Sequence, residues 1–187
     1  MIIVLFISLL SFNLGFAEKS NPKSLKGFEV LSGFARSRME KGKYRLYPLL
    51  VDLDFDLKDF FRSKGIRYYG LTEFQLEPFI NTVVRPNSNI EAGTAFMLKI
   101  GILPETLKFQ PYIKAGVGML FMSQHTREMS TRFNFLEQLG AGAHYFLTKK
   151  LALTAECRYR HVSNAGIREP NHGMNTWFYL GGITYRF

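Results

Sequence analysis

The sequence predicts an all-β protein, an eight-stranded antiparallel transmembrane β-barrel. Apolar and polar residues alternate with a period of two in eight segments, each ten or more residues long. A strand that crosses a bilayer at a tilt needs about 9–11 residues, so every segment is long enough to span one. The chain also ends in "ITYRF", in which apolar side chains alternate up to a terminal phenylalanine.

The alternation is clearest in "LLVDLDFDL", at positions 49–57. Its odd positions place leucine, valine and phenylalanine on one face, whereas its even positions place Leu50 and three aspartates on the other. A helix would scatter these carboxylates around its circumference, so the pattern indicates a strand. In chain order, the predicted strands cover 26–38, 43–57, 66–83, 90–103, 108–123, 132–147, 150–163 and 175–187.

The connections between these strands alternate in character. "LPETLK" and "LTKK" read as tight turns at one end of the barrel, the periplasmic end. "EKG", "RPNSN", "HTREMST" and the stretch after Ser163 belong to the opposite end and are polar or marked by Gly and Pro. The closing aromatic strand resembles the last strand of bacterial outer-membrane proteins.

A soluble, lipocalin-like barrel is the competing architecture, with its apolar face turned inward. The charged face decides between the two. It carries both signs of charge on several strands, so its members can neutralise one another inside a narrow lumen. A membrane barrel is therefore predicted, with a lumen filled by side chains rather than an open channel. The predicted inward-facing charges are Asp52, Asp54, Asp56, Glu73, Glu77, Lys99, Lys114, Glu156, Arg158 and Arg160.

The first 17 residues read as an export signal, which leaves residues 18–187 for the barrel domain. They are apolar from Ile2 and end in Gly15-Phe16-Ala17, with small residues at the two positions that a signal peptidase reads. A membrane anchor is the alternative, but 17 residues are short for one and the next residues are polar.

Composition narrows the class of partner and cofactor. The formal net charge of +9 favours a polyanion such as nucleic acid, an anionic membrane or lipopolysaccharide. The content of 18 Phe and 9 Tyr argues against nucleic acid. The single cysteine, Cys157, excludes an internal disulfide and a cysteine-based zinc cluster. His125 and His144 lack partners at metal-ligand spacing, and His172 lies in a predicted turn. No HExxH, calcium or phosphate-loop motif occurs, so no cofactor is expected.

One cluster of polar residues departs from the alternation. His161 and Ser163 continue the odd, lipid-facing positions of the seventh strand, and Asn175 shares the outward parity of the eighth. Residues i and i+2 of a strand lie on one face about 6–7 Å apart, so a histidine there can act as general base for the serine. The alternative is that the three are interfacial residues that bind lipid headgroups.

Around these residues the chain resembles the lipid A 3-O-deacylase (PagL) / acyloxyacyl hydrolase family of outer-membrane barrels. That family carries a His-x-Ser-Asn motif in its penultimate strand, which reads here His161-Val162-Ser163-Asn164. The resemblance implies that Ser163 is the nucleophile and His161 its general base. It implies an oxyanion hole from backbone N–H groups around Asn164 and Gly166. The partners that it implies are lipid A, or lipopolysaccharide, and the lipids of the bacterial outer membrane.

The chain departs from the family at the third catalytic position, where the family has Glu and this sequence has Asn175. An amide can orient a histidine, but it cannot offset the charge of an imidazolium. Glu137 and Glu169 are possible substitute acids. Folding the sixth and seventh strands about "TKK" places Glu137 beside Tyr159, one step from His161. A surface ion pair of Glu137 with Arg132 is the alternative.

Basic residues at the same end fit the phosphates of lipid A or form ordinary solvated charge; they are Arg36, Arg38, Lys41, Lys43, Arg45, Arg85, Arg127 and Arg168. The sequence thus predicts an outer-membrane enzyme that hydrolyses the ester-linked 3-O acyl chain of lipid A by Ser/His catalysis. A non-enzymatic barrel of structural or adhesin type, with a degenerate motif, is the alternative.

Overall fold

The structure, a computed structural model, describes residues 25–39, 42–124, 126 and 128–187. The expected signal peptide at 1–17 lies outside the described residues. The same is true of His125, Lys41 and Arg127.

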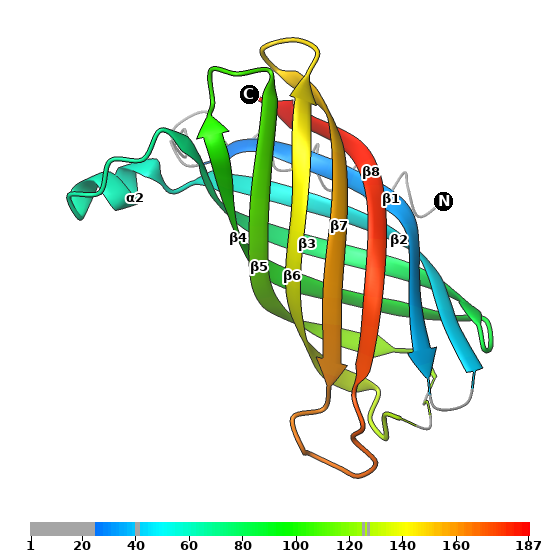
Figure 1. Cartoon of the computed structure of the whole chain (residues 1–187). Coiled ribbons are helices and arrows are strands. Elements are labelled where there is room, and N and C mark those ends of the chain that lie inside the picture. Colours follow the sequence, from blue (N-terminus) through cyan, green and yellow to red (C-terminus); the bar gives the residue numbers. More distant parts are fainter. Residues whose placement is uncertain (1–24, 40–41, 125, 127) are drawn as a thin grey trace, which may run out of the picture.

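Eight strands close into one antiparallel barrel, in which each strand pairs with its sequence neighbours and β8 returns to β1 (Figure 1). Closure leaves no free sheet edge, so the ladder satisfies the backbone within the membrane. The all-β, eight-stranded prediction is confirmed. The strands are β1 Leu25–Met39, β2 Gly42–Asp56, β3 Gly70–Arg85, β4 Asn89–Pro104, β5 Phe109–Met122, β6 Phe133–Phe146, β7 Leu151–Ser163 and β8 Met174–Arg186.

The predicted third strand begins four residues too early, because residues 66–69 lie outside the sheet. A short helix, α2 (Lys58–Ser63), follows β2 instead and projects from the end of the barrel that carries the short turns (Figure 1). Asp56 Oδ1 accepts the Lys58 N–H at 2.7 Å, which draws the chain away from the ladder. The helix ends at Ser63 and is followed by Gly65, whose φ is +79°, with the crossed backbone bonds of a Schellman motif.

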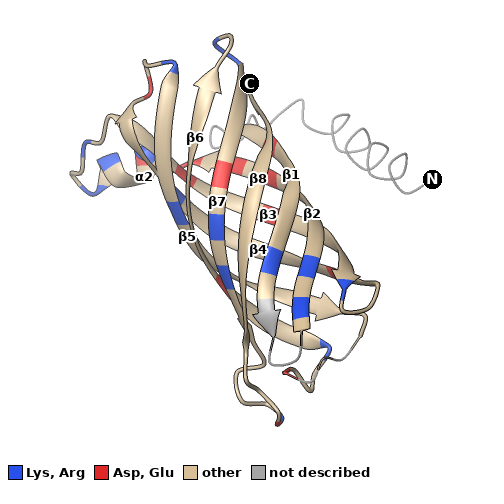
Figure 2. Cartoon of the chain, turned by 45° about the vertical axis from the view of Figure 1, so that its right-hand side comes forward, with Lys and Arg blue, Asp and Glu red and all other residues tan. Residues whose placement is uncertain are grey.

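The predicted inward-facing charges fill one part of the lumen. Arg158 binds Glu77 through two bonds of 2.5 and 2.8 Å and Glu156 through a third of 2.7 Å. Lys114 lies 3.3 Å from Glu77 and 3.5 Å from Asp52. Figure 2 shows these opposite charges distributed along the strands of the barrel. Most of these buried charges face a charge of opposite sign, which offsets the cost of burial. The satisfaction is incomplete, because neither Asp52 oxygen has a hydrogen-bond partner within the described residues and Asp54 is held by the Gln75 amide without an ion pair.

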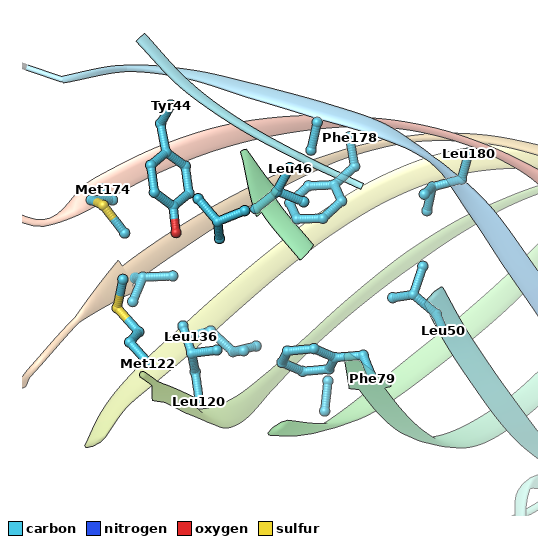
Figure 3. Close-up of a cluster of buried hydrophobic side chains, with 14 of the residues drawn as sticks. Tyr44, Leu46, Leu50, Phe79, Leu120, Met122, Leu136, Met174, Phe178 and Leu180 are labelled. Atoms are coloured by element: carbon cyan, nitrogen blue, oxygen red, sulfur yellow. The ribbon is translucent and has the colours of Figure 1, made fainter. Parts of the chain in front are cut away.

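The other part of the lumen is mainly apolar and encloses a single ion pair, of Arg160 with Glu91 at 3.0 Å, among the described residues. The sequence pattern did not predict this apolar part. A buried cluster lies toward the long connections and includes Tyr44, Met122, Leu136, Met174 and Phe178 (Figure 3). On β2 and β5 the same inward face carries charges further along the strand, at Asp52 and Lys114. The cluster fills the barrel behind the part of the wall where the candidate site lies.

The outer wall is apolar. Its large side chains remain exposed in the isolated chain, among them Leu139 at 62 %, Val117 at 59 % and Leu153 at 52 %. Charge inside and apolar surface outside is the arrangement of a membrane barrel and excludes the lipocalin-like alternative. Among the described residues no helix is long and apolar enough to cross a membrane.

Candidate active site on the outer wall

A row of three polar side chains crosses the outer wall where the sheet should be apolar. His161 of β7 lies in register with Glu137 of β6 on one side and with Asn175 of β8 on the other. Directly opposite residues of antiparallel strands have Cβ atoms about 4.5–5.5 Å apart, so both neighbours are within reach of the imidazole. His161 and Asn175 both occupy outward-facing positions of their strands, as the alternation predicted.

Asn175 binds the imidazole directly. Its Oδ1 lies 2.6 Å from His161 Nδ1, the one hydrogen bond that the structure gives this ring within the described residues. Because an amide oxygen only accepts, Nδ1 carries the proton in this arrangement. The lone pair therefore belongs to Nε2, which is the tautomer that a general base needs.

Glu137 is closer to the histidine than the sequence predicted. We expected it beside Tyr159, but Tyr159 pairs with Leu139 and Glu137 pairs with His161. The β6–β7 turn is wider than expected because Thr148 Oγ1 accepts the N–H groups of residues 150 and 151. The register moves by two residues, which preserves the face of each side chain. No ion pair among the described residues joins Glu137 to Arg132.

Gly173 packs against the other edge of the ring. It has a φ of +71°, and a Cβ built on it would lie 2.7 Å from His161 Cε1 and 3.2 Å from Nε2. A side chain here would clash with the imidazole as well as strain the backbone. Gly173 precedes Met174, the register partner of Val162, so it lies level with Ser163. The side of the ring that carries Cε1 and Nε2 therefore faces the end of β7 where Ser163 lies. In the sequence, the glycine of "HGMN" suggests only a turn and gives no sign of this contact.

Ser163 is the last residue of β7 and lies opposite Phe135 on β6. Its side chain is half-buried. The hydroxyl forms no hydrogen bond with any residue that the structure describes, and the imidazole is two residues away on the same face. The strand repeat puts their Cα atoms about 6–7 Å apart, a separation that two inclined side chains can span.

The backbone donors nominated for the oxyanion hole are both engaged. The Asn164 N–H donates to Asn171 Oδ1 at 2.9 Å, and the Gly166 N–H donates to Asn164 Oδ1 at 3.0 Å. Ala165 and Gly166 have φ values of +53° and +76°, as the central residues of a type I′ turn do, and the Ile167 N–H closes it on the Asn164 carbonyl at 3.1 Å. In this conformation neither N–H is open to a ligand.

The loop after Ser163 is held by the side chain of Asn164. This fully buried amide donates to the Arg168 carbonyl at 2.6 Å and to Ser130 Oγ, on the β5–β6 connection, at 3.3 Å. Asn171, which the sequence did not single out, is the acceptor for the Asn164 N–H. Glu169 accepts the Asn171 N–H at 3.0 Å, so its carboxylate serves the loop rather than the imidazole.

One group of carboxylates in the described chain has the spacing of a metal site, and it lies elsewhere. Oxygens of Glu29, Asp54 and Glu73 approach within 4.8 Å of one another inside the lumen. Two ammonium groups already balance them, since Lys99 binds Glu29 and Lys26 lies 3.4 Å from Glu73. This cluster belongs to the ionic interior and is separate from the outer row.

Comparisons with known proteins match the chain to one family. The family model described as "Lipid A 3-O-deacylase (PagL)" matches residues 51–182, which include His161, Ser163 and Asn175. The lipid A deacylase PagL of Bordetella bronchiseptica is 34% identical over 67 residues. That alignment spans 34% of this chain and 35% of the relative.

Solved structures show the same fold. The crystal structure of the outer membrane enzyme PagL superposes with a TM-score of 0.59 at 16% identity, over 84% of this chain and 97% of that one. Neisserial surface protein A (NspA) gives a TM-score of 0.66 at 11% identity, over 87% and 97% of the two chains. With its apolar outer wall, this chain is a barrel of the bacterial outer membrane. The chain belongs to the lipid A 3-O-deacylase (PagL) family.

Proposed function

We propose that the protein hydrolyses the ester that links the 3-O acyl chain to lipid A, with Ser163 as nucleophile and His161 as general base. The hydrogen bond from His161 Nδ1 to Asn175 Oδ1 carries the proposal, because it fixes the tautomer that leaves Nε2 basic. A hydrogen-bonded histidine on the lipid-facing wall has little use in packing. It is well placed for a substrate that is itself a lipid of the outer leaflet.

The reaction begins when the Ser163 hydroxyl attacks the ester carbonyl and His161 Nε2 takes its proton. The tetrahedral intermediate collapses to an acyl-serine as the C–O bond to the sugar breaks. The imidazolium returns the proton to the sugar oxygen, which leaves as the free 3-hydroxyl. Water then attacks the acyl-serine with the same histidine as base, and the products are the fatty acid and the regenerated serine.

The oxyanion needs donors close to the nucleophile. The Asn164 N–H is suitable because it directly follows Ser163, the position that supplies one oxyanion donor in many serine hydrolases. We infer that the substrate oxygen replaces Asn171 Oδ1 as its acceptor, and that the Gly166 N–H becomes the second donor after Asn164 Oδ1 moves away. This requires a local change in the loop, since both groups are engaged without substrate.

The charge that forms on His161 during the reaction needs a partner that Asn175 cannot provide. Glu137 supplies it in our proposal, because it is the direct cross-strand neighbour of His161. The histidine then has an amide on β8 to orient it and a carboxylate on β6 to offset its charge. Glu169 is less suitable, as its carboxylate binds the Asn171 N–H.

The experiment is to incubate the refolded protein with purified lipopolysaccharide and measure the free 3-hydroxy fatty acid by mass spectrometry. We expect release by the unaltered protein and none above background by Ser163→Ala. Cys157→Ser is the matched control, because Cys157 is exposed on the same face of β7, away from the row. It should release fatty acid at the rate of the unaltered protein.

The alternative function is a structural or adhesin-type barrel with a degenerate motif. It is favoured by two observations, the amide at position 175 and the engaged N–H groups of Asn164 and Gly166. Failure of a demonstrably folded barrel to release fatty acid from several kinds of lipid A would exclude the hydrolase and leave this alternative.

A further inference from the structure

A band of positive charge borders the candidate active site on the outer wall. Arg36 of β1 lies in register with Trp177 of β8 and with Arg45 of β2, and Arg45 lies in register with Arg85 of β3. Lys43 is two residues from Arg45 on the same face of β2, and all four cations are exposed. In Figure 2, basic segments of β1 and β2 lie side by side near the end that carries the long connections.

These cations have no carboxylate partner in the part of the chain that the structure describes. The Arg36 guanidinium donates to Tyr179 Oη at 3.4 Å and lies 5.6 Å from the centre of that ring, which leaves its charge uncompensated. Like charges directly opposite each other on neighbouring strands are destabilising. The juxtaposition of Arg36, Arg45 and Arg85 is therefore unfavourable until an anion lies between them.

The band and the active-site row share one hollow. Arg36, Lys43 and Arg45 line a surface depression of about 660 Å³, and Asn175 and Trp177 form its other side. Asn175 is the residue that binds His161, so a ligand in this depression is in contact with both the cations and the site. Neighbouring strands are about 4.8 Å apart, which puts β2 roughly 10 Å from β8, comparable with the width of a phosphorylated sugar.

We propose that Arg36, Lys43 and Arg45 form a phosphate-binding subsite, which holds a phosphate group of the acylated glycolipid while its ester lies against Ser163. The inference rests on the proposed function for the identity of the glycolipid. Arginine suits this role because its planar fork binds phosphate oxygens in pairs. The subsite would orient the sugar so that one particular ester reaches the nucleophile.

Binding is measured with the Ser163→Ala protein, so that the lipid is not consumed. The probe is Trp177, the one tryptophan of the chain, which lines the hollow. The protein in uncharged detergent micelles is titrated with bisphosphorylated lipid A, with the same lipid A after chemical removal of both phosphates, and with phosphatidylglycerol. The test variant adds Arg36→Gln and Arg45→Gln.

Two further variants serve as controls. One adds Lys64→Gln and Arg67→Gln, which removes the same charge from the exposed connection after α2, at the opposite end of the barrel. The other replaces Arg36 and Arg45 by lysine, which retains the charge. Folding of every variant is checked by its heat-dependent mobility in gel electrophoresis.

We expect a saturable change in Trp177 fluorescence with the phosphorylated lipid A. Its affinity should fall about tenfold or more when both arginines become glutamine, since charge-assisted bonds to phosphate are lost. The control at 64 and 67 should bind as before, and the lysine variant should lie between. Equal affinity for the two forms of lipid A, no effect of the arginine changes, or an equal response to phosphatidylglycerol would each overturn the subsite.

This test separates the two proposals. A folded protein that binds phosphorylated lipid A selectively but releases no fatty acid would refute the hydrolase and keep the subsite. If the protein releases fatty acid but binds lipid A with the same affinity whether or not the phosphates are present, the subsite is refuted and the hydrolase is not.

Discussion

His144 and His161 lie on neighbouring strands of one sheet, yet their surroundings differ completely. His144 faces the lumen, where Nδ1 meets Thr154 Oγ1 at 2.9 Å and Nε2 lies 3.4 Å from Lys99 Nζ. Its ring also stacks on Tyr112. His161 faces outward with one nitrogen bound to Asn175 and the other edge turned toward Gly173.

The comparison shows that polar groups which stabilise the barrel and polar groups proposed to react lie on opposite faces of the same sheet. Inside, the polar atoms of His144 are used by protein partners, as they must be where water is scarce. On the outer wall the Ser163 hydroxyl has no partner within the described residues and the imidazole keeps one nitrogen for a proton. Groups that are left unsatisfied at a lipid-facing surface are available to a lipid substrate.

The largest effect is expected from removing the catalytic pair. Ser163→Ala, His161→Gln and the double variant should all fall to the same low rate of fatty acid release, at least about 10³-fold below the unaltered protein, because the two residues act as one unit. The measurement is the initial rate on lipopolysaccharide for each single and double variant. Losses that multiply in the double variant would show that the residues act independently.

The second largest effect is expected from a substitution at Gly173, which packs against the imidazole of His161. Gly173→Ala should lower the rate about 10²-fold, because a methyl group would displace the imidazole by a fraction of an ångström or more from the serine. Gly65→Ala is the matched control, since Gly65 has a similar φ of +79° but open space around its Cα. Equal losses in both variants would mean that backbone strain, and not the histidine, is responsible.

A smaller effect tests which residue offsets the imidazolium charge. Glu137→Gln should lower the rate roughly tenfold through loss of a charged neighbour, and Asn175→Glu in the same protein should restore it from the other side. Rates are compared for the two single variants and the double variant. If Glu137→Gln leaves the rate unchanged, Asn175 alone supports His161.

The smallest effect on the chemistry is expected from the lumen. Arg158→Met removes one of the two buried cations that pair with Glu77 and Glu156, leaves only Lys114, and should lower the free energy of unfolding by about 3–5 kcal/mol. Release of fatty acid per folded molecule should stay the same. Denaturant unfolding and the rate, measured on one preparation, check this. A parallel fall in both would show that the ionic interior and the outer row are coupled.

Local pattern was enough to predict the strands and the face of each site residue. Alternation placed Asp52 and Arg158 inside and His161 outside, because a strand separates its two faces regardless of register. It could not give the register of the β6–β7 hairpin, which depends on the Thr148 side chain in the turn. The prediction therefore paired Glu137 with Tyr159, two residues from its observed partner His161.

Other features depend on contacts that one segment does not contain. The helix α2 begins where the Lys58 N–H binds Asp56 Oδ1 and stops before Gly65, and neither feature shows in the period-two pattern. The engaged N–H of Asn164 requires Asn171, seven residues further on in a folded loop. The contact of Gly173 with His161 joins two strands. Such details require the packed loop and could not be predicted from periodicity.

The most direct test of the central claim is the rate at which an alkyl fluorophosphonate modifies the folded protein, with the modified residue located by mass spectrometry. Only an activated serine reacts rapidly, so the test does not depend on the lipid. We predict modification at Ser163 in the unaltered protein and in His144→Gln, and none in His161→Gln. Modification that persists in His161→Gln, or that falls on another serine, would contradict the assignment of the outer row as the active site.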